Sequence, residues 1–281
     1  MSATVAPQTA LRPTSGGTAD SDGVWIAWRS HGTGEPVLMI MGFMGSSRAW
    51  FRLLPHVAAG HRAIVFDNRG TGDSDRPPGL WGMRDLVRDA VAVLDAAGEE
   101  SAHVIGASMG GMIAQQLALD HPDRVRSLTL AATQAARSGG PPPWRMMASL
   151  ALRSVLGPGR TFALVAPLLY SERTRSERKD RLEEDIRIRT QDATPAATAP
   201  AQMAAIVRHD TRRRLGELRM PVLVVHGEED RLVSTDLGRE LAQRIPGSEL
   251  VLIPQCGHVI TTDAEERVVP AILGFLERCA G

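Results

Sequence analysis

The sequence has 281 residues, and 43% of them are hydrophobic, so it can bury a substantial core as one large domain or as a domain with an insertion. Its 32 basic and 32 acidic residues cancel. This balance argues against a nucleic-acid-binding protein, whose phosphate contacts need an excess of cations. Two cysteines, Cys256 and Cys279, are too few for a disulfide scaffold or a four-thiolate zinc site.

Residues 1–22 are rich in Ser, Thr, Ala, Pro and Gly, and we predict that they form a flexible tail. They lack the basic start, apolar middle and small-residue cleavage site of a secretory signal. The sequence contains no run of about eighteen apolar residues, which a membrane span would need. We therefore expect a soluble, cytoplasmic protein that does not insert into a membrane.

Short apolar runs then alternate with longer segments of helical periodicity. Four runs are typical of strands buried on both faces, namely residues 37–41, 63–66, 103–105 and 222–225. Further strand candidates are residues 24–28, 127–131 and 250–253. Helices are predicted over residues 83–97, 109–119, 236–244 and 264–278. This alternation indicates an α/β domain, in which helices flank a mostly parallel sheet.

Residues 134–217 break the alternation, because they contain no convincing strand. Their predicted helices cover residues 150–156, 161–169 and 173–189. The segment begins after one strand candidate and ends before another. We therefore predict a core of residues 23–133 and 218–281, with residues 134–217 as a helical cap. The cap would lie over the carboxyl edge of the sheet, where α/β proteins bind ligands.

A G-x-S-x-G motif, formed by Gly106, Ser108 and Gly110, lies between a predicted strand and a predicted helix. Glycines on both sides of the serine allow a tight turn that lifts its hydroxyl out of the sheet. The helix N-terminus then points at the hydroxyl and stabilises developing negative charge. The motif alone is common by chance, but this position makes Ser108 a candidate nucleophile.

A serine nucleophile needs a histidine held by a carboxylate. Asp230 follows the strand at 222–225, and His258 follows the strand at 250–253. Both would lie at the sheet edge where Ser108 emerges. Glu228 and Glu229 are close enough to compete with Asp230, but the spacing H-G-x-x-D favours Asp230. We interpret His226, at the end of a buried strand, as structural.

These residues, together with MGFMGSS at 41–47 and DNRGTGDS at 67–74, resemble the α/β-hydrolase-fold serine enzymes over residues 23–280. The resemblance implies a mostly parallel sheet of about eight strands, flanked by helices, with a helical cap inserted after the sixth strand. It also implies an oxyanion hole made by the backbone N–H groups of Phe43 and Met109. We expect the 67–74 loop to be structural, pinned by hydrogen bonds and ion pairs.

The first loop departs from many relatives, which carry His-Gly where this chain has Met41-Gly42. The histidine positions neighbouring groups in those relatives, so its absence need not abolish catalysis. Met-Gly followed by D-N-R-G-T-G-x-S resembles the branch that contains polyketide methylesterases such as aclacinomycin methylesterase.

Apolar residues of the first loop and of the predicted cap are candidates for lining a substrate pocket. They are Met41, Met44, Trp144, Met146, Met147, Phe162 and Tyr170, and we expect about half of those in the cap to form its own core instead. The sequence has no cluster with the spacing of metal ligands and no Gly-rich phosphate motif. It therefore predicts chemistry without a metal or cofactor.

The prediction is a hydrolase that cleaves a carboxylic ester of a small, largely apolar molecule through an acyl-enzyme. Lactonase, C–C hydrolase, thioesterase and perhydrolase activities would use the same three residues. A non-hydrolytic ligand-binding or biosynthetic protein is an alternative of another class. Epoxide hydrolases and haloalkane dehalogenases are disfavoured, because they need aspartate where Ser108 stands. The sequence gives no oligomeric state.

Overall fold

The computed structural model describes residues 11–137, 144–191 and 194–280. Its strands are β1 (Ser15–Ser21), β2 (Val24–His31), β3 (Pro36–Ile40), β4 (Arg62–Phe66), β5 (Ala102–Ala107), β6 (Val125–Ala131), β7 (Val222–Gly227) and β8 (Glu249–Ile253). In the described ranges these eight strands form one sheet, in the order β1-β2-β4-β3-β5-β6-β7-β8. The pairs β1–β2 and β2–β4 are antiparallel, and the pairs from β4 to β8 are parallel. The predicted α/β architecture is confirmed.

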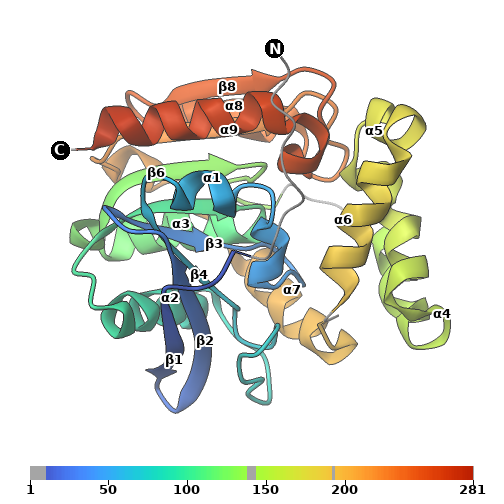
Figure 1. Cartoon of the computed structure of the whole chain (residues 1–281), viewed down its shortest axis with the longest axis horizontal. Helices are drawn as coiled ribbons and strands as arrows, with labels where there is room; N and C mark the ends of the chain where they lie inside the picture. Colours follow the sequence, from blue (N-terminus) through green and yellow to red (C-terminus); the bar gives the residue numbers. More distant parts are fainter. Residues whose placement is uncertain (1–10, 138–143, 192–193, 281) are drawn as a thin grey trace.

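Helices cover both faces of the sheet, so its central strands are buried on both sides (Figure 1). The flanking helices are α1 (Leu54–Ala58), α2 (Met83–Ala97), α3 (Met109–Asp120), α8 (Thr235–Arg244) and α9 (Ile260–Cys279). Alternate residues of β3 point to opposite faces. Leu38 and Ile40 pack in one core with residues of α2, α3 and α8, while Val37 and Met39 pack in a second core with residues of α1 and α9.

The predicted flexible tail at residues 1–22 is wrong for its last part. Strand β1 pairs with β2 from Ser15–Ser30 to Ser21–Val24. The connecting turn places Asp22 and Gly23 at φ values of 53° and 80°, and the Gly23 N–H donates to Asp20 Oδ1 at 2.7 Å. Asp-Gly is a strong hairpin signal that outweighs the polar composition of this strand. Residues 1–10 of the predicted tail lie outside the described residues.

The chain between β6 and β7, called the insertion below, is mainly helical in its described part. It forms α4 (Trp144–Leu169), α5 (Glu172–Glu177), α6 (Lys179–Gln191) and α7 (Ala199–Arg208). The predicted gap between two helices corresponds to a break inside α4, where Gly157 has φ 77° and ψ 164°. The single helix predicted at 173–189 is wrong, because non-helical Arg178 divides it into α5 and α6. Helix α7 was not predicted.

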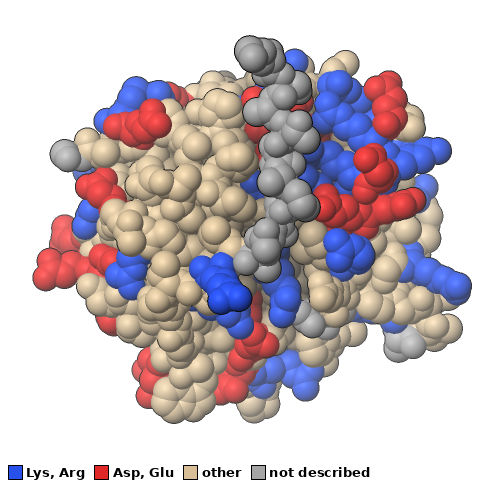
Figure 2. Space-filling view, in the orientation of Figure 1, with Lys and Arg blue, Asp and Glu red and all other residues tan. Residues whose placement is uncertain are grey.

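The insertion lies beyond the end of the sheet to which the arrows of β6 and β8 point (Figure 1). Acidic and basic side chains are interspersed over α5 and α6 (Figure 2). Arg175 forms an ion pair with Glu172, and Arg181 with Glu265 of α9, the latter at 2.6 Å. These two arginines of the insertion are thus matched by acidic groups, one locally and one across to the core.

Candidate active site

Ser108 occupies a strained turn between β5 and α3. Its backbone has φ 55° and ψ −119°, which side-chain-bearing residues rarely adopt. A Cβ at Gly106 would lie 2.4 Å from the carbonyl oxygen of Gly110, and one at Gly110 would lie 2.0 Å from that of Ile40. Only glycine fits at these two positions, so the motif forms the tight strand–turn–helix that its glycines predict.

Asp230 and His258 come from the loops after β7 and β8 and meet directly. His258 Nδ1 lies 2.7 Å from Asp230 Oδ2. The other carboxylate oxygen accepts backbone N–H groups from Leu232 at 2.9 Å and Val233 at 2.8 Å. Burial alone would raise the pKa of Asp230, but the bonds and charges of His258 and His226 outweigh it and hold that pKa well below its usual value. The buried carboxylate is therefore ionised and orients the His258 ring.

His226 supports this carboxylate from the other side. Its side chain is fully buried, and its Nε2 lies 2.9 Å from the carbonyl oxygen of Val233 and 3.3 Å from Asp230 Oδ2. Because a carbonyl oxygen can only accept, Nε2 carries the proton and is shared between the two oxygens. This arrangement agrees with the structural interpretation of His226.

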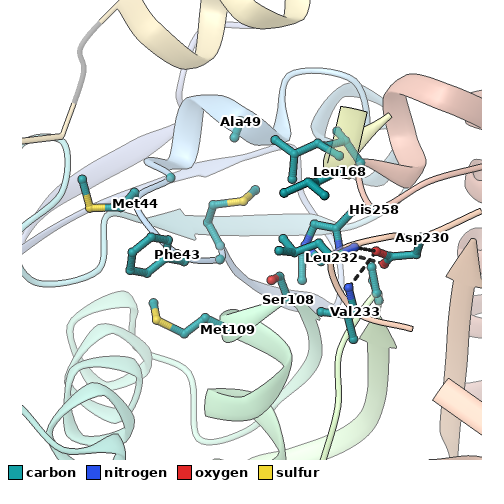
Figure 3. A pocket seen from close by; sticks show the side chains of 18 of the residues that line it. Phe43, Met44, Ala49, Ser108, Met109, Leu168, Asp230, Leu232, Val233 and His258 are labelled. Atoms are coloured by element: carbon teal, nitrogen blue, oxygen red, sulfur yellow. Dashed lines mark hydrogen bonds and ion pairs between the residues drawn. The ribbon is translucent and has the colours of Figure 1, made fainter. Parts of the chain in front are cut away.

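A cavity of about 770 Å³ joins these groups. Ser108, Asp230 and His258 line it, and most of the remaining lining is apolar. In Figure 3, Ser108 lies between the His258–Asp230 pair and the side chains of Phe43 and Met109. The predicted pocket residues Met41 and Met44 line the cavity, and so do Phe43 and Met109, the predicted oxyanion donors.

Three of the predicted pocket residues lie elsewhere. Trp144 and Met147 are 72% and 49% exposed, because the opposite face of α4 is turned to the cavity. Tyr170 is buried, and its hydroxyl donates to the carboxylate of Asp185 rather than facing the cavity. Sequence reasoning also missed several lining residues of α4, namely Ser149, Leu150, Arg153, Val165, Leu168 and Leu169. Helical periodicity alone does not reveal which face of an isolated segment packs inward.

The first loop lies against the Ser108 turn. A Cβ at Gly42 would be 3.0 Å from Ser108 Cβ and 3.6 Å from the backbone nitrogen of Met109. Met109 begins α3, so its N–H has no acceptor within the helix. The backbone of Gly42, next to Phe43 in the chain, therefore adjoins a helix N-terminus, which favours negative charge.

Backbone strain concentrates around the cavity. Met44, Ser108 and Ala132 all line it, and their φ values are 60°, 55° and 48°. Each such conformation costs on the order of 1–3 kcal/mol and persists only where the surrounding structure enforces it. Strain of this kind is typical of functional sites.

The loop at 67–74 is held by its own polar groups. Asp67 accepts the backbone N–H groups of Ser47 at 2.7 Å and Asp73 at 2.9 Å. Buried Arg69 forms two hydrogen bonds with Asp89 of α2, at 2.7 and 2.6 Å. These contacts match the predicted structural role, and the Asp67–Ser47 bond anchors the loop that also carries Phe43.

A cysteine nucleophile and a bound metal ion find less support. Cys256 is fully buried, and burial raises the pKa of its thiol, so the reactive thiolate is disfavoured. Within residues 11–137, 144–191 and 194–280, no three His, Cys, Asp or Glu side chains form a group that could hold a metal ion.

The described helices include none with the length and apolarity needed to cross a bilayer.

Comparisons with known proteins agree with the observed fold. Residues 35–264 match a family model described as alpha/beta hydrolase fold. The chain is 32% identical over 262 residues to the "Putative carbamate hydrolase RutD" of Azorhizobium caulinodans, covering 92% of this chain and 96% of the relative. It is 29% identical over 275 residues to the 2-hydroxy-6-oxononadienedioate/2-hydroxy-6-oxononatrienedioate hydrolase of Paraburkholderia phymatum, covering 89% and 90%. A solved structure of a thermophilic esterase from Thermogutta terrifontis, with malate bound, has a TM-score of 0.83 and 28% identity, covering 95% and 100%.

Proposed function

The chain belongs to the alpha/beta hydrolase fold family, and we propose that it is a serine hydrolase that cleaves a carboxylic ester through an acyl-enzyme. One observation carries the proposal. The strained Ser108 at the start of α3 opens into the same cavity as the hydrogen-bonded Asp230–His258 pair. Nucleophile, base and orienting carboxylate are the three parts that acyl transfer by serine requires.

In the first step, Ser108 Oγ attacks the ester carbonyl while His258 Nε2 takes its proton. Asp230 keeps the proton of Nδ1 in place and stabilises the imidazolium. The tetrahedral intermediate expels the alcohol, which receives the proton from His258, and the acyl group stays on Ser108. In the second step, water activated by His258 attacks the acyl carbon, and the acid leaves as Ser108 recovers its proton.

The N–H groups of Phe43 and Met109 are the proposed donors to the oxyanion. Gly42, which precedes Phe43 in the chain, lies against Ser108 and the backbone of Met109, which supports the assignment. Removing one such donor typically costs on the order of 100- to 1000-fold in rate. Because both donors are backbone groups, side-chain changes at Phe43 or Met109 would act on them only indirectly.

The apolar cavity supports a small, largely apolar substrate. The esterase of Thermogutta terrifontis supports the ester as the bond cleaved. The other two relatives are named for carbamate hydrolysis and for hydrolysis of an oxo-dienedioate, and attack by the same serine could serve either chemistry. Ester cleavage is proposed because it needs no group beyond those around Ser108.

The test combines labelling with turnover. A fluorophosphonate probe is expected to label Ser108, located by mass spectrometry of the peptide, and to abolish hydrolysis of short p-nitrophenyl esters. Ser108→Ala should lose labelling and at least about 1000-fold in kcat while remaining folded. Full turnover by folded Ser108→Ala would overturn the proposal, and absence of labelling would favour a non-hydrolytic role. Parallel assays with carbamates, lactones, thioesters, C–C hydrolase substrates and peracid formation identify the preferred reaction.

A further inference from the structure

One face of α4 forms a wall of the cavity. Met146, Ser149, Leu150 and Arg153 all line it, and their spacing of three, four and seven residues places them on the same side of the helix. Trp144 and Val155, on the other side, are 72% and 78% exposed. The first half of α4 thus places an arginine in a mainly apolar lining.

Arg153 is half-buried, and the described residues around it do little to balance the positive charge of its guanidinium. In the described part of the chain its guanidinium makes one hydrogen bond, to the carbonyl oxygen of Thr194 at 3.1 Å, and has no carboxylate within ion-pair distance. A guanidinium carries five N–H donors, so most of them have no acceptor among the described residues. Burial lowers the pKa of Arg153, and no acid among the described residues offsets that effect. Its positive charge is therefore destabilised in the structure as it stands.

Arg189 of α6, which also lines the cavity, shows the usual arrangement. Its Nε donates to Asp185 at 2.6 Å. Burial acts to lower the pKa of Arg189, but the charge of Asp185 outweighs it and raises that pKa. Asp230, the one acid among the described lining residues, is already bonded to His258. The cavity therefore holds a cation whose matching anion is not supplied by the described lining.

We propose that Arg153 binds a carboxylate of the substrate, so that the substrates are esters with a carboxylate at the far end of an apolar chain. This inference rests on the proposed function, because it assumes that the ester carbonyl lies at Ser108. A methyl half-ester of a linear dicarboxylic acid has the required parts. Water would cleave its ester bond to give methanol and the dicarboxylic acid, while the free carboxylate stays paired with Arg153.

The kinetic test compares monomethyl with dimethyl esters of the C5 to C10 dicarboxylic acids. At the best chain length, the wild-type protein should cleave the half-ester with a kcat/KM about 10- to 100-fold above that of the diester, mainly through KM. Arg153→Met should lose this preference, and Arg153→Lys should retain part of it. Arg160→Met, an exposed arginine on the same helix, is the matched control and should keep the preference. A wild-type protein that prefers the diester at every length would overturn the inference without any variant.

A binding test separates this inference from the proposed function. Titration calorimetry on Ser108→Ala should show octanoate binding at least about tenfold more tightly than octanamide, and the difference should vanish when Arg153→Met is added. If this holds while the wild-type protein cleaves no ester, the proposed function fails and the anion site stands. If esters are cleaved but octanoate has no advantage, the anion site fails and the hydrolase stands.

Discussion

The backbone N–H of Met44 donates a hydrogen bond of 2.8 Å to Oε1 of Gln202. Met44 follows Phe43 in the first loop and has a φ of 60°, while Gln202 is a fully buried residue of α7 in the insertion. This bond joins the insertion to the loop that carries the proposed oxyanion donor. The position of α7 and the geometry around Ser108 are therefore linked.

Replacing Gln202 with Leu should lower kcat for ester hydrolysis by roughly 10- to 100-fold and change KM much less. The variant leaves the Met44 N–H without its acceptor, so the strained loop can relax, and small displacements of catalytic groups are costly. Steady-state kinetics with p-nitrophenyl esters measure both constants. Gln191→Leu, at an exposed position of α6, is the control and should change neither. A fall in kcat/KM carried by KM alone would contradict the link.

Gly238 of α8 packs against His226, and this contact should reverse the usual effect of a helical Gly→Ala change. Alanine normally stabilises a helix interior by about 0.5–1 kcal/mol. Here the new Cβ would lie 2.5 Å from His226 Nδ1 and 2.9 Å from its Cγ. We expect Gly238→Ala to lower the free energy of unfolding by about 1–3 kcal/mol and to reduce kcat, since His226 supports Asp230.

Gly274 of α9 provides the comparison for that experiment. A Cβ there would meet only the end of the flexible Arg278 side chain, at 3.6 Å. Gly274→Ala should therefore stabilise the protein by about 0.5–1 kcal/mol and leave kcat unchanged. Urea unfolding of both variants measures the difference. Equal stabilisation by both changes would show that the His226 contact relaxes at no cost.

His209 should make the fold sensitive to acid. Burial, partly offset by the charge of Asp210, lowers the pKa of His209 from 6.5 to about 4. Between about pH 6.5 and 4, His209 is therefore protonated in the unfolded chain but neutral in the folded chain. The free energy of unfolding falls as the pH drops through this interval. Between pH 7.5 and 4.5 the loss from this residue should be roughly 2–3 kcal/mol.

His209→Met should remove this contribution, so that its unfolding free energy falls less than that of the wild-type protein over the same pH interval. Urea titrations at pH 7.5 and 4.5 measure the two losses. His121→Met, at an exposed position, should behave as the wild-type protein does. Identical losses in the wild-type protein and His209→Met would mean that His209 is protonated in the fold.

The core strands and the Ser108 turn could be predicted because their signals are local. Runs such as residues 37–41 are apolar throughout, since both faces of a central parallel strand are buried. Gly106 and Gly110 mark the turn because no larger residue fits there. Strand β1 was missed because its residues are mostly exposed, and only the Asp-Gly turn and the pairing with β2 reveal it.

By itself, the sequence determined the α/β class, the tight turn at Ser108 and the identity of the residues that could act with it. These follow from backbone sterics and from strand and helix periodicity, which depend on near neighbours in the chain. Only the tertiary structure decided which face of α4 meets the cavity, that Tyr170 is bonded to Asp185, and that Arg153 lacks an acidic partner among the described residues. Burial and charge pairing depend on contacts between distant segments, and periodicity within one helix carries no record of them.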